Sequence, residues 1–341
     1  MTPRALFICG SLNQTKQMHA VARELPEFDA GFTPFYGDRT VEGMRRLGLI
    51  EGTIGGNKRR SVCLVYLAAQ RLRLDMHGLR GGYDLVVTCT DLLIPRNVTG
   101  VPLVVVQEGI LEKDNAISAL CRRAKWLPRW LAGSSLTGES LLYDRFCVAS
   151  EGYRERLIRR GAAPDRVIVT GIPNFDDCES YRSNDFPHRG FVLACTSDLR
   201  ETFQYDDRSS FIRRALALAA GRTLIFKLHP NENVARARRE ISRLAPGARI
   251  YTHGSAEEMI ANCSVLITQT SSTVFVGMAL GKEVHSDFPP AELRRLLPWQ
   301  NGGTSGARIA AVCRDLLGLE PRRASTTAFS GLEKALPWQH P

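Results

Sequence analysis

Short apolar runs alternate along this chain with longer stretches in which apolar residues recur every three or four positions. Short runs of this kind are typical of buried strands, and the longer amphipathic stretches are typical of helices. Strands that alternate with helices predict parallel sheets covered by helices on both faces. The apolar runs lie at residues 5–10, 83–90, 101–109, 144–150, 165–171, 189–197, 222–230, 248–254 and 264–272.

The alternation stops near the middle of the chain and then begins again. A polar, turn-rich segment at residues 178–190 separates the two series. A chain of 341 residues also exceeds what one hydrophobic core usually supports. We therefore predict an α/β protein of two Rossmann-like domains that face a cleft. The N-terminal domain covers residues 1–177, the C-terminal domain covers 178–320, and a tail at 321–341 crosses back or is loosely ordered.

Composition narrows the class of protein. Hydrophobic residues make up 44% and charged residues 23% of the chain, as in ordinary globular proteins. No apolar run approaches the roughly 18 residues that cross a bilayer, so we expect a cytoplasmic protein. The nine cysteines are scattered and form no CxxC pair. This pattern favours reduced, structural thiols over a disulfide framework or a zinc site.

A formal net charge of +10 indicates either Arg-rich codon usage or an anionic partner. Nucleic acid is the weakest candidate because no helix-turn-helix, RNA-recognition or finger pattern occurs. Residues 121–130 interleave four cations with two tryptophans, and two interpretations are equally good. The segment makes peripheral contact with an anionic membrane or glycolipid headgroup, or its tryptophans are core residues beside a solvated cationic face.

Polar clusters follow two strands of the second half, where ligands bind in open parallel sheets. Thr270, Ser271, Ser272 and Thr273 form a run of hydroxyl residues at the start of an expected helix, which suits a phosphate group. Ordinary N-capping is the alternative. The second cluster, which ends another strand, contains Lys227, His229 and Asn231. A histidine beside phosphates can donate a hydrogen bond or act as an acid or base, and the alternative is an exposed turn.

The first half carries three candidate positions at strand ends. Glu108 follows the strand at 101–106 and could act as a general base on a hydroxyl or a sugar carbon. Asp91 follows the strand at 83–90, and Gly10 and Ser11 follow the first strand. A solvated loop carboxylate is an equally good interpretation of Glu108 by itself. The dinucleotide fingerprint, a Walker A sequence and a convincing metal-binding acid pair are all missing, so we predict no NAD and no metal.

These segments together resemble the GT-B nucleotide-sugar superfamily. The chain is most similar to the branch shared by UDP-N-acetylglucosamine 2-epimerases and bacterial surface-polysaccharide glycosyltransferases, over residues 5 to about 290. Five segments carry the resemblance in the same order: GSLNQTKQM at 10–18, VQEGI at 106–110, residues 146–176, LHPNENV at 228–234, and LITQTSSTVFVGMALGKEV at 266–284. The resemblance implies two Rossmann-like domains with a nucleotide between them.

The chain departs from the epimerase pattern at several positions. Leu12 stands where that pattern has an arginine, the segment before residue 140 lacks paired acids, and the last motif lacks Ser-Gly-Gly. The chain also resembles bacterial sialyltransferases and related CMP-sugar transferases, which have acid-Glu-Gly, His-Pro and Ser-Ser/Thr motifs. That resemblance implies Glu108 as general base, His229 on the departing phosphate, and Ser271 and Ser272 as its holders, although Gln107 replaces the first acid.

The sequence therefore predicts a metal-independent glycosyltransferase of bacterial surface-glycan synthesis. Its donor would be a CMP- or UDP-linked sugar and its acceptor a glycan or glycolipid, with no further cofactor and no nucleic-acid partner. The first domain would bind the acceptor and the second the donor. A UDP-N-acetylglucosamine 2-epimerase-like epimerase or hydrolase is the first alternative. A non-catalytic nucleotide- or glycan-binding protein is the second.

Overall fold

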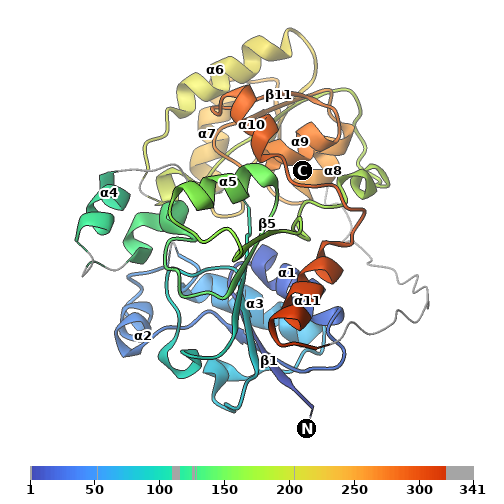
Figure 1. The fold of residues 1–341 in the computed structure, drawn as a ribbon. Helices are drawn as coiled ribbons and strands as arrows, with labels where there is room; N and C mark the ends of the chain where they lie inside the picture. Colours follow the sequence, from blue (N-terminus) through green and yellow to red (C-terminus); the bar gives the residue numbers. More distant parts are fainter. Residues whose placement is uncertain are drawn as a thin grey trace. The chain divides into compact units, whose positions relative to one another are not determined.

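The structure is a computed structural model that describes residues 2–51, 53–109, 116–124, 127, 129–202 and 204–319. The chain divides into two compact units (Figure 1). The first comprises Met1–Asp176 and Pro298–Pro321, and the second comprises Asp177–Leu297 among the described residues. Each unit is built around its own parallel sheet with helices, which confirms the predicted α/β class with two Rossmann-like units.

The first unit contains a six-stranded parallel sheet in the order β2-β1-β3-β4-β5-β6. Strands β3 and β4 read LVVT and LVVV and are buried at every position, as expected for central strands covered on both faces. The strands are β1 (Arg4–Cys9), β2 (Asp29–Pro34), β3 (Leu85–Thr88), β4 (Leu103–Val106), β5 (Arg145–Val148) and β6 (Val167–Val169). Strand order reverses between β1 and β3, which is where ligands bind in such sheets.

Helices of the first unit follow the strands in sequence. Ser11 caps α1 by accepting a hydrogen bond from the Gln14 N–H, so the chain enters the helix directly at the end of β1. The α-helices are α1 (Leu12–Arg23), α2 (Arg39–Arg46), α3 (Asn57–Ala69), α4 (Ala116–Arg123), α5 (Glu151–Arg159) and α11 (Ser305–Leu316). Short 3₁₀ helices are η1 (Met76–Gly78), η2 (Arg96–Val98) and η3 (Arg129–Leu136).

The second unit contains a five-stranded parallel sheet in the order β11-β10-β7-β8-β9. Here the strand order reverses between β7 and β10. The strands are β7 (Val192–Cys195), β8 (Leu224–Lys227), β9 (Arg249–Tyr251), β10 (Val265–Thr268) and β11 (Glu283–His285). The helices are η4 (Cys178–Arg182), η5 (Arg200–Thr202), α6 (Arg208–Ala219), α7 (Val234–Leu244), α8 (Ala256–Asn262), α9 (Thr273–Ala279) and α10 (Pro290–Leu296). Its core joins the inner faces of β7, β8 and β10 to α6 and α7.

The structure differs from the sequence-based division at the C-terminal end of the second domain. Helix α11 packs against α1 of the first unit, and Arg314 pairs with Glu27 at 2.6 Å. The Asp176 carboxylate also accepts a hydrogen bond from the Ser305 N–H at 2.7 Å. The chain therefore returns to the first unit at Pro298, about twenty residues before the predicted tail. The tail itself, from residue 320, lies outside the described residues.

Within the described part of the chain, no helix is both long and apolar enough to cross a membrane. All nine cysteines are buried thiols. Several of them, such as Cys9, Cys147 and Cys195, end or lie within core strands, where a small apolar side chain fits.

Candidate functional site

The second unit brings three loops together at the carboxyl edge of its sheet, beside the strand-order reversal. The loops follow β7, β8 and β10, and side chains connect them directly. The Ser197 hydroxyl donates to Gln269 Oε1 at 2.7 Å, which joins the β7 and β10 loops. The Asn231 amide donates to Asp198 Oδ2 at 2.9 Å, which joins the β7 and β8 loops. The predicted residues His229, Asn231 and Ser271 therefore belong to one loop cluster on one edge.

His229 is held by its own loop and remains partly accessible, with its side chain 36% exposed. Its Nδ1 accepts a hydrogen bond from the Asn231 N–H at 3.2 Å and lies 3.5 Å from Asp198 Oδ2. When Nδ1 accepts a hydrogen bond, a neutral imidazole carries its hydrogen on Nε2. The ring can then present an N–H donor to an anion, and Asn231 acts on the ring through its backbone.

The hydroxyl run lies at the start of α9. Ser271 and Thr273 hydrogen-bond each other through their hydroxyls at 2.9 Å, and the Thr273 N–H donates to Ser271 Oγ at 3.4 Å. Ser272 is the N-cap residue but makes no side-chain capping bond. Thr270 is exposed, and the three residues after it are partly exposed. A pair of hydroxyls uses only one of its two hydrogens internally, so the other can donate to a ligand oxygen.

Lys227, the last residue of β8, lies inside the unit rather than on the exposed edge. It is 6% exposed, and its Nζ donates to the Leu228 carbonyl at 2.9 Å. Burial lowers the pKa of this ammonium, and the nearby carboxylates of Glu257 and Glu232 partly counter the effect. These contacts indicate that Lys227 supports the β8 loop from below.

Sequence reasoning missed a group of buried charges beneath these loops. Arg208, the first residue of α6, is 3% exposed and pairs with Asp206 at 3.0 Å and with Glu232 at 2.8 Å. Burial raises the pKa of Glu232, and the positive charge of Arg208 opposes that rise. Asp206 and Arg208 were invisible as site residues because they lie in a polar connection with no motif. The only available signal was a cluster of charges directly before an amphipathic helix.

Glu108 of the first unit lies just after β4, and its carboxylate accepts hydrogen bonds from the start of α1, which follows β1. The Ser11 hydroxyl donates to Glu108 Oε1 at 2.6 Å, and the Gln14 amide donates to Oε2 at 2.5 Å. The Asn174 amide also donates to the Glu108 backbone carbonyl at 3.3 Å. An ionised carboxylate can only accept hydrogen bonds, and here each of its two oxygens has one donor that fixes its orientation.

The residues around Glu108 explain two features of the sequence. A Cβ atom on Gly10 would lie 1.8 Å from Gln14 Oε1, so glycine leaves the space through which Gln14 reaches Glu108. Gln107 is buried, accepts from the Ala149 N–H at 3.0 Å and donates to the Gly109 carbonyl at 2.7 Å. A carboxylate at position 107 could not donate that second bond. Glutamine is therefore a structural requirement here, where sialyltransferases have an acid.

Asp91 is engaged in building a loop. It is 1% exposed, and its two oxygens accept hydrogen bonds from the Gly138 N–H at 2.8 Å and the Ser140 N–H at 3.0 Å. The Tyr143 hydroxyl donates to the Gly138 carbonyl at 2.8 Å and completes the same arrangement. A buried carboxylate whose two oxygens both accept hydrogen bonds from the backbone is suited to hold the loop at 138–140. It is not accessible to act as a base on a bound ligand.

The basic and aromatic segment at 121–130 is described only in part. Cys121 is buried beside Ala132 and Leu136, and the Arg122 guanidinium donates two hydrogen bonds to Glu139. Residues 125, 126 and 128 lie outside the described residues, as does the side chain of Trp130. The two interpretations of this segment both stay predictions.

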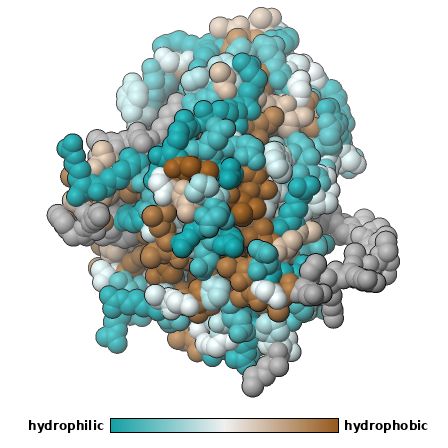
Figure 2. Space-filling view, viewed as in Figure 1, coloured by the Kyte–Doolittle hydropathy of each residue, from teal (hydrophilic) through white to brown (hydrophobic). Residues whose placement is uncertain are grey.

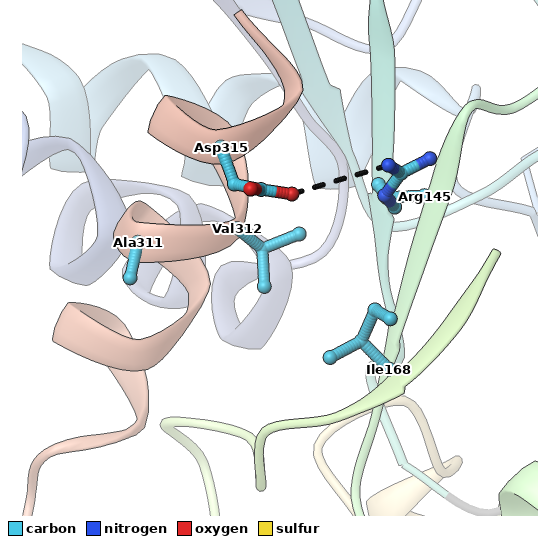
Figure 3. Close-up of a pocket in the computed structure, with 5 residues that line it drawn as sticks. All are labelled: Arg145, Ile168, Ala311, Val312 and Asp315. Atoms are coloured by element: carbon cyan, nitrogen blue, oxygen red, sulfur yellow. Dashed lines mark ion pairs between the residues drawn. The ribbon is translucent and has the colours of Figure 1, made fainter. Parts of the chain in front are cut away.

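The first unit also contains a cavity that is lined by none of the predicted site residues. The cavity of about 280 Å³ opens between α11 and the strands β5 and β6, lined by Arg145, Ile168, Ala311, Val312 and Asp315 (Figure 3). Hydrophobic residues also gather around this region on the face shown in Figure 2. Its single ion pair joins Arg145 to Asp315 at 3.9 Å. Apolar walls with one paired cation do not provide the donors that a phosphate needs. Among the described residues, no group of three or more His, Cys, Asp or Glu side chains is arranged to hold a metal ion.

Comparisons with known proteins show which solved structures share this fold. No family model and no curated protein sequence matches the chain. Solved structures do match it: S. aureus MnaA with UDP has a TM-score of 0.61 and 13% identity, covering 96% of this chain and all of that one. The UDP-GlcNAc 2-epimerase of Neisseria meningitidis, bound to UDP-GlcNAc, has a TM-score of 0.57 and 13% identity over 92% of this chain and all of that one.

The UDP-GlcNAc 2-epimerase of Methanocaldococcus jannaschii, in complex with UDP-GlcNAc and UDP, has a TM-score of 0.57 and 13% identity. This match covers 92% of the present chain and 99% of the other. The likeness extends over nearly the whole of each chain while very few residues are identical. The chain thus has the fold of the UDP-GlcNAc 2-epimerases, a two-domain Rossmann-like fold of the GT-B type, as the sequence predicted.

Proposed function

We propose that this protein is an enzyme of sugar-nucleotide metabolism that acts on a UDP-linked amino sugar directly, as an epimerase or hydrolase. The single observation that carries the proposal is the loop cluster of the second unit, where His229 and the Ser271–Thr273 hydroxyls share one sheet edge with its strand-order reversal. An imidazole N–H and hydroxyl donors are suited to a diphosphate. Neighbours of the same fold hold UDP or UDP-GlcNAc, which supports UDP as the nucleotide.

In this proposal the second unit binds the diphosphate, and Glu108 of the first unit is the acid–base group. The hydrogen bonds from Ser11 and Gln14 orient the carboxylate, so that it can take a proton from a sugar carbon or from an attacking water. His229 would stabilise negative charge that develops on the departing phosphate. Fixed donors of this kind require little rearrangement during the reaction.

The buried Gln107 argues against the sialyltransferase-like transferase that the sequence predicts. The motif of that family begins with an acid, and here the matching position is the buried Gln107, whose amide bridges Ala149 and Gly109. A glycosyltransferase and a non-catalytic binding protein are the two alternative functions that the following test distinguishes from the proposed one.

The test begins with UDP-GlcNAc and no acceptor, in D2O buffer. An epimerase that removes and returns a proton at carbon produces a second sugar nucleotide with deuterium at that carbon, and a hydrolase releases free sugar and UDP. Turnover only after an acceptor is added would instead establish a transferase. UDP binding without turnover under either condition would establish a binding protein.

Variants then assign the residues. Loss of a hydrogen bond to a charged group lowers affinity roughly ten- to hundred-fold, which we expect for UDP binding by His229→Ala and Ser271→Ala. His253→Ala and Ser210→Ala are the matched controls because both positions are exposed in the same unit. Glu108→Gln should abolish turnover and leave UDP affinity close to that of the wild-type protein. Wild-type affinity in both His229→Ala and Ser271→Ala would refute the assignment of the phosphate site.

A further inference from the structure

Three charged side chains lie buried together beneath the loop cluster of the second unit. The side chains of Arg208 and Glu232 are each 3% exposed, and that of Asp206 is fully buried. Arg208 Nε donates to Asp206 Oδ2 at 3.0 Å, while Nη2 donates to the Ser197 carbonyl at 2.9 Å and pairs with Glu232 Oε1 at 2.8 Å. One guanidinium therefore contacts two carboxylates and the end of the β7 loop.

Each carboxylate connects onward to a different part of the candidate site. Glu232 Oε2 accepts from the His229 N–H at 3.1 Å and from the Thr196 hydroxyl, so it fixes the backbone that carries the imidazole. Asp206 Oδ1 accepts from the Gln269 amide at 3.0 Å, and Gln269 directly precedes the hydroxyl run. One route from His229 to the hydroxyl run thus passes through Arg208, which contacts both carboxylates. A second route passes through the hydrogen bonds of Asn231 to Asp198 and of Ser197 to Gln269.

We propose that Arg208 is a positioning residue that sets the His229 loop and the Ser271–Thr273 loop in one fixed relation, so that both address the same anion. The guanidinium does this without touching the ligand, because it lies behind both loops and is almost completely buried. The inference rests on the proposed function for the identity of the anion, and the coupling between the two loops stands apart from it.

The geometry explains why this position needs arginine. A guanidinium presents several donors in a rigid planar fork and can pair with two carboxylates at once, whereas an ammonium is a single point charge. Without Arg208, the buried Glu232 would lose the cation that it pairs with, which is strongly unfavourable, whereas Asp206 would keep its contact with Arg200 at 3.0 Å. Arg200 makes no ion pair with Glu232 among the described residues.

The experiment follows the two loops separately from folding. The histidine ring resonances of uniformly labelled protein report on the His229 loop, and His229→Ala assigns the signal among the seven histidines. UDP affinity by calorimetry reports on the site as a whole, and thermal unfolding reports on stability. Arg208→Met removes the cation, Arg208→Lys keeps the charge without the fork, and Arg213→Met is the control on the exposed face of the same helix.

We expect Arg208→Lys to fold, to shift the His229 resonance and to bind UDP about ten-fold more weakly, and Arg213→Met to match the wild-type protein in all three measurements. The double variant Arg208→Met/Glu232→Gln removes one buried charge of each sign and keeps the protein measurable where Arg208→Met is too unstable. It should regain thermal stability over Arg208→Met and still bind UDP at least ten-fold more weakly than wild type.

Two results would overturn the inference. One is an unshifted His229 resonance in Arg208→Lys and in the double variant, because the imidazole loop would then not depend on the guanidinium. The other is wild-type UDP affinity in the double variant, which would make Arg208 a purely structural charge. If the wild-type protein binds no UDP, the proposed function fails, and the resonance of His229 still decides whether Arg208 couples the loops.

Discussion

Replacing Asp91 separates a structural carboxylate from a catalytic one. Sequence position alone gives Asp91 the same standing as Glu108, since both follow central strands of the first sheet. The structure shows Asp91 1% exposed, with its oxygens accepting from the N–H groups of Gly138 and Ser140. We therefore expect Asp91→Asn to change the stability of the first unit and to leave ligand affinity in the second unit unchanged.

The size of the effect follows from the two hydrogen bonds. A hydrogen bond to a charged group contributes about 1.5–3 kcal/mol, and a buried donor left without a partner is itself unfavourable. Asparagine keeps one acceptor oxygen and turns an NH2 group towards the second N–H, so Asp91→Asn should lower the free energy of unfolding by about 2 kcal/mol. Asp91→Ala loses both bonds and should lower it by about 4 kcal/mol. For a unit of this size, about 2 kcal/mol corresponds to a fall in Tm of roughly 4–8 °C.

Urea unfolding followed by circular dichroism measures the stability, and calorimetry with UDP measures the site. Asp165→Asn is a suitable control because Asp165 is exposed in the same unit. Asp91→Asn with wild-type stability would refute the assignment of a loop-building role. Normal stability combined with lost turnover would return Asp91 to the catalytic group.

Three further predictions concern packing, thiols and pH. Gly138→Ala should lower the free energy of unfolding in urea by at least about 2 kcal/mol more than Gly100→Ala does. Both glycines have φ +85°, but only at position 138 would the new Cβ lie 2.5 Å from Leu157 Cδ2. Equal losses of unfolding free energy in the two variants would refute the packing argument. The cysteines should resist Ellman's reagent in the native protein and react after unfolding, since all nine are buried and burial raises the pKa of Cys147 to about 12; rapid native reaction would contradict this. The backbone N–H of Asn57 donates a hydrogen bond to the Glu51 carboxylate and lowers its pKa. The carboxylate therefore stabilises the start of α3 fully when the pH is above the pKa of an unfolded glutamate. The stabilisation is lost as the pH falls through the lower pKa of the folded state. The stability difference between Glu51→Gln and wild type should therefore shrink on acidification, and a constant difference from pH 7 to pH 3 would show that the charge is not responsible.

The local pattern of the sequence predicted nine of the eleven strands in the described residues and missed β2 and β11, the edge strands next to β1 and β10. Runs such as LVVT and LVVV are short, apolar and rich in valine, and they became central strands buried at each position. The same logic placed Glu108, His229 and Ser271 at strand ends, because a parallel sheet ends all its strands at one edge. Predictions of this kind depend only on residues near each other in the chain.

Features that depend on distant residues were not accessible in this way. Arg208 acts through Glu232 and Asp206, and neither spacing nor composition shows that a charge at the start of α6 lies beneath a loop after β8. Asp91 looked like a candidate base until its partners at 138 and 140 were visible. The return of α11 to α1 is likewise a packing event between the two ends of the chain, since Arg314 pairs with Glu27. The sequence showed which polar residues follow the strands. Only the tertiary contacts showed which of these residues are exposed and which are buried and hold a loop in place.

The two hydrogen bonds to the Glu108 carboxylate allow a direct test of whether this group is the base of the reaction. Ser11 and Gln14 each donate one hydrogen bond to one oxygen of the carboxylate, which fixes its orientation and leaves its remaining lone pairs to take a proton. Ser11→Ala and Gln14→Leu each remove one donor, so turnover should fall roughly ten-fold in each variant while UDP affinity stays at the wild-type value. If the reaction exchanges a carbon-bound hydrogen with solvent, the rate of deuterium entry should fall by the same factor in these variants. Wild-type turnover in both variants would show that the base of the reaction is another group.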